Sequence, residues 1–347
     1  MSRRGSGALT RREALRAGAG AGAGLLLAGC GVQGGSSGGG GGGEKESDYP
    51  TRAVELVAPF SPGGSTDLIS RAIAKAAKEP LGQAMVVVNR EGANGAVGGR
   101  EVVTGNPDGY RVVFLPTSLF TITPQVVKDA DTLSLDDMRI ITGLTVENIV
   151  LLSHRDSPYK TLDDLLKEKD SGKRVSYSHS GTGSGLQFAQ NVFYRRAGIN
   201  AADVPFDGAA PAITALLGKQ VDAGASQIAE SIKQVQAGEL RHLGIFSAER
   251  SELLPDVPTM KEQGFDIQID QVRFIAAPPK VPEDVATKLN EAFLAAAKDP
   301  DYDKFLKDNY IEHREISGDE VRKKVETDFA RYKATIDELK IRPEASS

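Results

Sequence analysis

The stretch PFSPGGSTD (59–67) joins the apolar run VELVAP (54–59) to the run LISRAIAKAAKE (68–79). This order predicts a strand, a Pro-Gly-Gly turn and a helix near 66–79, because apolar residues recur at helical spacing after the turn. A glycine-rich turn before a helix presents free N–H groups and the positive end of the helix dipole. The stretch therefore predicts an α/β fold with an anion-binding turn, although an ordinary capped turn explains the local sequence equally well.

The candidate ligand contacts in this turn are Ser61, Gly63, Gly64, Ser65 and Asp67. No Gly-Lys-Ser/Thr follows the glycines, so the turn is not a Walker phosphate loop. Asp67 would repel an anion. We therefore expect Asp67 to brace the turn, or to meet an amino group if the ligand has one.

The alternation of strand-like and helix-like runs continues along the chain. Further strands are expected at 85–89, 111–116, 148–152, 174–178, 221–226 and 241–246. Helices are expected at 96–104, 161–169, 184–197, 208–217, 228–237, 282–298 and 318–338. Near-continuous apolar strands separated by helices predict parallel sheets covered on both faces, with ligands bound beyond the carboxyl ends of the strands. The length after residue 49 suggests two domains.

A second glycine loop, SHSGTGSG (178–185), follows the strand expected at 174–178. Its candidate contacts are Ser180, Gly181, Thr182, Gly183 and Ser184, which offer backbone N–H groups and hydroxyls. The G-x-G-x-x-G spacing fails because Leu186 stands where the third glycine belongs, which argues against a dinucleotide cofactor.

Three further candidates end strands or begin turns: Thr117, Ser118 and Asp207. An ordinary turn explains these residues equally well, and the same holds for Asn94 in EGANGAVGG (91–99). Arg273 lies in the apolar stretch IDQVRFIAAPP (269–279) and needs a partner. That partner is either a structural carboxylate or a ligand carboxylate held bidentately, and the sequence leaves both open.

The N-terminal segment predicts export. TRREALR (10–16) is a twin-arginine pattern, and AGAGAGAGLLLAG (17–29) is an apolar stretch too short to span a bilayer. Ala14 replaces the usual Phe, which leaves the general export route open. LAGC (27–30) resembles a lipobox, so we expect a signal peptide at 1–29, a lipid on Cys30 and a flexible Gly-rich tether over 30–48.

Composition argues against several functions. Residues 1–29 carry five Arg and one Glu, so the remaining chain has a net charge of −9, against −5 for the whole, and no basic run. We therefore expect no nucleic-acid partner. The four histidines lack metal-ligand spacing, and no G-x-S-x-G motif occurs. We expect no metal, no cofactor and no enzymatic activity, the alternative being a secreted serine hydrolase using Ser184 or Ser65.

The chain resembles the tripartite tricarboxylate transporter substrate-binding proteins, the Bug family, over 49–340. The resemblance is carried by YPTRAVELVAPFSPGGSTDLISR, NPDGYRVVF, VSYSHSGTGSGLQFA, VPFDGAAPAITALLGKQVDA and AAPPKVPEDVATKLNEAF. It implies a type II periplasmic-binding fold, with lobe one at 49–150 plus 272–345 and lobe two at 151–271. Gln187 and Val272 depart from the family pattern, where His and Trp are common, so the ligand cannot be carried over from a relative.

The resemblance also implies a function. A small organic carboxylate would lie between Ser61–Asp67 and Ser180–Ser184, and a monomeric, extracytoplasmic, lipid-anchored receptor would deliver it to a large and a small membrane permease subunit. The same fold would serve a receptor for an ATP-driven importer or for a sensor kinase. An ATPase gene nearby would favour the importer.

Overall fold

The computed structural model describes residues 48–128, 130 and 132–345 of the 347-residue chain. The predicted export signal, the lipidation site Cys30 and nearly all of the Gly-rich tether lie outside the described residues. Within the described part, no helix combines the length and the apolar character needed to cross a membrane.

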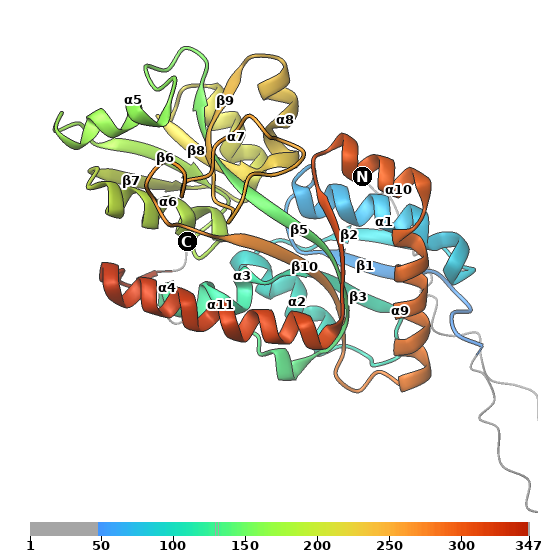
Figure 1. Cartoon of the computed structure of the whole chain (residues 1–347). Coiled ribbons are helices and arrows are strands. Elements are labelled where there is room, and N and C mark those ends of the chain that lie inside the picture. Colours follow the sequence, from blue (N-terminus) through green and yellow to red (C-terminus); the bar gives the residue numbers. More distant parts are fainter. Residues whose placement is uncertain (1–47, 129, 131, 346–347) are drawn as a thin grey trace, which may run out of the picture. The chain divides into compact units, whose positions relative to one another are not determined.

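A ten-stranded sheet forms the framework (Figure 1). The strand order is β2-β1-β3-β10-β5-β8-β6-β7, and β11 and β9 also pair with β5. The strands are β1 (Val54–Ala58), β2 (Met85–Asn89), β3 (Arg111–Pro116), β5 (Arg139–His154), β6 (Val175–His179), β7 (Ala201–Pro205), β8 (Ala223–Gln227), β9 (Leu240–Ile245), β10 (Asp270–Ala277) and β11 (Glu312–Ile316). Short β4 (Val127–Lys128) and β12 (Glu344–Ala345) pair separately.

Two groups of parallel strands stand at the ends of this sheet. We call β2, β1 and β3 the first strand group, and β8, β6 and β7 the second. The expectation of parallel strands is confirmed for β1, β2, β3, β6 and β8, whereas β7 was not predicted. It is wrong for β5 and β9, which pair antiparallel with each other, and the unpredicted strands β10 and β11 also pair antiparallel. A continuous apolar run predicts burial on both faces but carries no information about strand direction.

Strand β5 connects the two groups by changing partners along its length. Residues 139–148 pair with β10, and Ile149–Ser153 pair with β8. Only its second half was expected from the sequence, because the first half, RIITGLTVEN, mixes polar and apolar residues. Strand β10 runs beside β5 between the two strand groups (Figure 1).

Helices follow most of the parallel strands. They are α1 (Ser65–Leu81), α2 (Ala96–Val103), α3 (Ser118–Thr121), α4 (Thr123–Val126), α5 (Leu162–Leu166), α6 (Gly185–Ala197), α7 (Ala209–Leu217), α8 (Ile228–Gln236), α9 (Glu283–Ala297), α10 (Pro300–Asp308) and α11 (Gly318–Leu339). Eight of them match expected ranges to within a few residues, whereas α3, α4 and α10 were not predicted. Short 3-10 turns occupy Ala93–Gly95, Leu135–Asp137 and Lys167–Lys169.

The apolar cores follow the strand groups. Leu56, Phe114 and Phe293 are fully buried in a cluster that includes α1, α9 and β10. Another cluster surrounds β6 and α6. The last helix joins both regions, because Val321 packs beside β3 while Tyr332 packs on Phe188 of α6 with ring centroids 5.3 Å apart.

Candidate ligand-binding site

Asp67 holds the first glycine loop in shape. Its Oδ2 accepts a hydrogen bond from the Gly63 N–H (3.0 Å), and its Oδ1 meets Arg71 (2.8 Å) and the Asn89 amide (3.0 Å). Burial opposes ionisation of Asp67, but the bonds from Arg71, Gly63 and Asn89 outweigh it and lower the pKa of the carboxyl. A permanently charged carboxylate therefore ties the turn to α1 and β2.

The second glycine loop is held by a different network behind it. The Gly183 N–H donates to Gln187 Oε1 (2.7 Å), and Gln187 Nε2 donates to Asp203 Oδ2 (2.9 Å). His179 Nε2 lies 3.1 Å from the same Asp203 oxygen, and its Nδ1 accepts from the Gly181 N–H (3.2 Å). Gln187, which departs from the family pattern, thus supports the loop from inside.

The two strand groups touch through these loops. Asn94 Nδ2 and Thr123 Oγ1 each donate to the Gly183 carbonyl at 3.1 Å. Gly208 lies so close to Ser61 that an added Cβ would collide with the Ser61 hydroxyl, and its φ of +117° is one that other residues rarely adopt. The glycines here allow backbone to approach the opposite loop.

Two adjoining cavities lie between the loops. The inner one has a volume of about 20 Å³ and the outer one about 320 Å³, and both are lined by Phe60, Ser61, Asn94 and Ser180. The predicted residues on the inner cavity are Ser61, Gly64, Ser65, Ser180, Ser184 and Arg273. Those on the outer cavity are Ser61, Ser180, Gly181, Thr182 and Asp207. The structure thus brings most of the predicted residues together at the carboxyl ends of parallel strands.

Five predicted residues line neither cavity: Gly63, Asp67, Thr117, Ser118 and Gly183. Thr117 and Ser118 are buried behind the inner cavity. Ser118 Oγ accepts a hydrogen bond from Gln271 Nε2 (2.6 Å), and Thr117 Oγ1 accepts one from the Val272 N–H (3.3 Å). Gln271, which does line the inner cavity, separates Ser118 from it.

Arg273 has a protein partner. Its Nε donates to Glu147 Oε2 in a buried ion pair, and the Ser65 hydroxyl donates to the other oxygen of Glu147. This is the structural carboxylate that the sequence left open. Arg273 Nη1 is buried and finds no hydrogen-bond partner among the described residues, so the guanidinium keeps a donor at the inner cavity.

A second carboxyl group, that of the half-buried Glu230, lines the inner cavity. Desolvation and the charge of Glu147 raise its pKa to about 7, although the Ser65 N–H, Arg273 and the Gln227 N–H act in the opposite direction. The inner cavity is therefore lined by one guanidinium and one carboxyl group, and the Glu147 carboxylate that pairs with Arg273 lies behind them.

Sequence reasoning missed Glu147, Gln227, Glu230 and Gln271, which lie on or beside the inner cavity. Glu147 was detectable, because a charged residue in the buried run LTVENIVLL needs a partner and Arg273 was the matching candidate. Gln227 and Glu230 lie where β8 passes directly into α8 without a glycine turn, so no loop motif marks them.

A larger cavity of about 650 Å³ lies away from both loops. It is lined by residues of β5, α10, β11, α11 and the loop after β9, including Val146, Arg250 and His313. We place the ligand site between the glycine loops because two helix N-termini, several hydroxyls and the Nη1 donor of Arg273 converge there. In the described part of the chain, no group of three His, Cys, Asp or Glu residues is placed to hold a metal.

Comparison with known proteins identifies the family and the fold. Residues 69–341 match the model of the tripartite tricarboxylate transporter family receptor. Solved structures of similar fold include the periplasmic binding protein BugD (26% identity, TM-score 0.80, 85% of this chain and 100% of that one). They also include a Rhodopseudomonas palustris protein with adipate (26%, 0.81, 86% and 100%) and MatC from the same organism with malate (26%, 0.75, 83% and 100%). The expected fold and the expectation of a binding protein rather than an enzyme are confirmed.

Proposed function

Because the chain belongs to the tripartite tricarboxylate transporter receptor family, we propose that it binds a small organic carboxylate between its two glycine loops. The observation that carries the proposal is the meeting of Ser61–Asp67 and Ser180–Ser184 around two adjoining cavities. The adipate and malate bound by two structural neighbours support the ligand class.

The chemistry at the cavities suits an anion. The N-terminal ends of α1 and α6 both point a helix dipole at the cleft, through Ser65 on one side and Ser184 on the other. Arg273 pairs with Glu147 and still has a buried Nη1 donor that no hydrogen bond among the described residues uses. Ser180 and Thr182 supply hydroxyls toward the outer cavity, where the remainder of the ligand would lie.

Binding would be completed by hinge closure. We assign lobe one to 49–150 plus 272–345 and lobe two to 151–271, with β5 and β10 as the connecting strands. The inner cavity is too small for a carboxylate, so the ligand would enter with the loops apart and favour the arrangement in which both loops contact it.

Delivery would follow at the membrane. The export signal at 1–29, a lipid on Cys30 and the Gly-rich tether would hold the receptor at the outer face of the cytoplasmic membrane. A large and a small integral permease subunit would then take up the carboxylate from the monomeric receptor.

A thermal-shift panel tests the ligand class. The purified protein is heated with adipate, malate, citrate, aromatic acids and amino acids, and with sugars and divalent metals as controls. Only a ligand that prefers the folded, closed protein raises the melting temperature, by an amount that grows with its concentration. A response to a sugar or a metal with silence from every carboxylate would overturn the proposal.

A further inference from the structure

Glu230 of α8 reaches across the cleft to the first residue of α1. Its Oε1 accepts a hydrogen bond from the Ser65 N–H (3.0 Å), and its Oε2 accepts one from the Gln227 N–H (2.9 Å). Helix α1 has Gly64 at its N-cap, which brings no side chain to the free N–H groups of the first turn. Glu230, on the helix that follows β8, therefore caps α1, the helix that follows β1.

The neighbouring amides of this loop are already used by the loop itself. The Gly63 N–H donates to Asp67 (3.0 Å), and the Gly64 N–H donates to the Ser61 carbonyl (3.4 Å). The inner cavity beside them, at about 20 Å³, has room for roughly one water molecule. A ligand carboxylate has no place at the start of α1 while Glu230 remains there.

We infer that Glu230 is an internal competitor of the ligand, whose carboxylate holds the place at the N-terminus of α1 that a ligand carboxylate takes on binding. The inference rests on the proposed function, because both use the same loop. Both groups present carboxyl oxygens as acceptors, so a ligand carboxylate replaces the Glu230 carboxyl without leaving the Ser65 N–H unbonded. The measured free energy of ligand binding is then the ligand's own interaction free energy minus the free energy lost when Glu230 leaves the Ser65 N–H.

The charges around Glu230 allow it to be displaced. Glu147 faces it from β5 and Arg273 from β10, and Arg273 is paired with Glu147 rather than with Glu230. One guanidinium thus lies near two carboxyl groups, of which only the buried Glu147 forms an ion pair with it. An incoming anion also meets the unused Nη1 of Arg273, a donor that Glu230 does not engage.

Three variants test the inference. Glu230→Ala removes the competitor, and Glu230→Asp keeps an acid at the third position of α8 while shortening the side chain so that it no longer reaches Ser65. Glu320→Ala is the matched control, because Glu320 fills the same capping-box position in α11, where it accepts from the Ser317 N–H (2.8 Å), away from the cleft. Circular dichroism and melting temperature establish that each variant folds.

Calorimetric titration with adipate, malate and citrate gives the decisive comparison. Loss of a helix-capping competitor should tighten binding of a carboxylate roughly three- to thirtyfold in both Glu230 variants and leave Glu320→Ala at the wild-type affinity. Binding by the variants alone, with none by the wild type, supports the inference equally. If both Glu230 variants bind the carboxylate with the wild-type affinity or more weakly, the inference is overturned while the proposed function stands. Absence of carboxylate binding in every protein overturns both.

Discussion

At the scale of single residues, the central feature is one guanidinium near two carboxyl groups, the buried Glu147 and the half-buried Glu230. Arg273 neutralises Glu147, and the Ser65 hydroxyl completes the bonding of that carboxylate. Glu230 is left with backbone N–H groups as its bonding partners and Arg273 as a more distant charge. The two acids therefore differ in role: Glu147 belongs to a fixed pair, and Glu230 is free to exchange.

Arg273→Met tests the fixed pair. Removing the guanidinium leaves Glu147 charged and buried, which should lower the free energy of unfolding by about 3 kcal/mol. Adding Glu147→Leu removes the stranded charge and should recover at least half of that loss. Urea denaturation measures both variants, and a loss below about 1 kcal/mol in the single variant would show that the pair does not stabilise the fold.

The raised pKa of Glu230 predicts a pH dependence of stability. In the unfolded chain the Glu230 carboxyl has its ordinary pKa of 4.5, whereas in the folded protein its pKa is raised to about 7. Between these two pKa values the folded state binds more protons than the unfolded state. The stability that this proton contributes is therefore complete below about pH 4.5 and is lost as the pH rises toward 7. The full change is roughly 3 kcal/mol.

Glu230→Gln isolates this effect, because the amide does not titrate. Urea denaturation of both proteins at about pH 5, 6, 7 and 8 should show the wild type losing stability relative to the variant as the pH rises. Parallel stability curves would mean that Glu230 titrates as an ordinary exposed acid.

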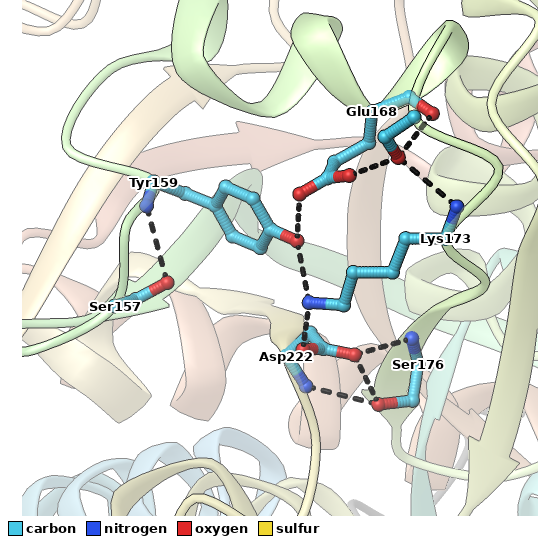
Figure 2. A network of polar contacts seen from close by, with 7 residues as sticks. Ser157, Tyr159, Glu168, Lys173, Ser176 and Asp222 are labelled. Atoms are coloured by element: carbon cyan, nitrogen blue, oxygen red, sulfur yellow. Dashed lines mark hydrogen bonds and ion pairs between the residues drawn. The ribbon is translucent and has the colours of Figure 1, made fainter.

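At the scale of elements, a polar network anchors the loops of the second strand group to its sheet (Figure 2). Lys173 Nζ bonds to Asp222 Oδ1 (2.7 Å) and to the Tyr159 hydroxyl (2.9 Å), and that hydroxyl donates to Glu168 (2.9 Å). Asp222 also accepts from the N–H and hydroxyl of Ser176, the second residue of β6. Segments far apart in sequence are thus held at the amino end of β6, away from the glycine loop at its other end.

Lys173→Met should lower the free energy of unfolding by about 1 kcal/mol, because it removes two hydrogen bonds from a charged donor that is partly screened by solvent. Lys167→Met is the matched control, since Lys167 forms an exposed ion pair with Asp164 (2.7 Å) and its loss should cost clearly less stability than Lys173→Met. Equal losses from the two variants would mean that the network adds nothing beyond a surface ion pair.

Gly208→Ala tests whether the elements on either side of the cleft must approach. The added methyl group would strain the backbone at φ +117° and force the Ser61 hydroxyl to move, so carboxylate affinity should fall by at least about tenfold. Gly172→Ala is the control for a positive-φ glycine away from the cleft, because Gly172 has a φ of +74° and no atom within 4 Å of an added Cβ. Calorimetry compares the two variants, and equal affinities would contradict the closure account.

At the scale of the whole described chain, three elements connect the regions around the two strand groups. β5 and β10 run between them, and α11 contributes to a core on each side (Figure 1). In the proposed closure, a hinge built on paired strands and a shared helix would favour two discrete arrangements over gradual deformation, because packed cores resist intermediate states. Ligand binding at the loops would then favour the closed arrangement.

Local signals predicted much of this framework. Five of the six parallel strands, most helices and both glycine loops were expected, because apolar periodicity and glycine turns can be recognised in short stretches of sequence. The antiparallel course of β5 and β10 was not, since pairing direction depends on partners distant in the chain. The roles of Glu147, Gln271 and Glu230 escaped for the same reason: each acquires its function from a residue more than 100 positions away.

A crystal structure of the protein with the carboxylate that raises its melting temperature most would test the central claim most directly. We predict a carboxylate group within hydrogen-bonding distance of the Ser65 N–H, with the Ser180–Ser184 loop closed over the ligand and Glu230 moved away from α1. A ligand bound instead in the cavity beside Val146, Arg250 and His313, with Glu230 still on Ser65, would contradict the account.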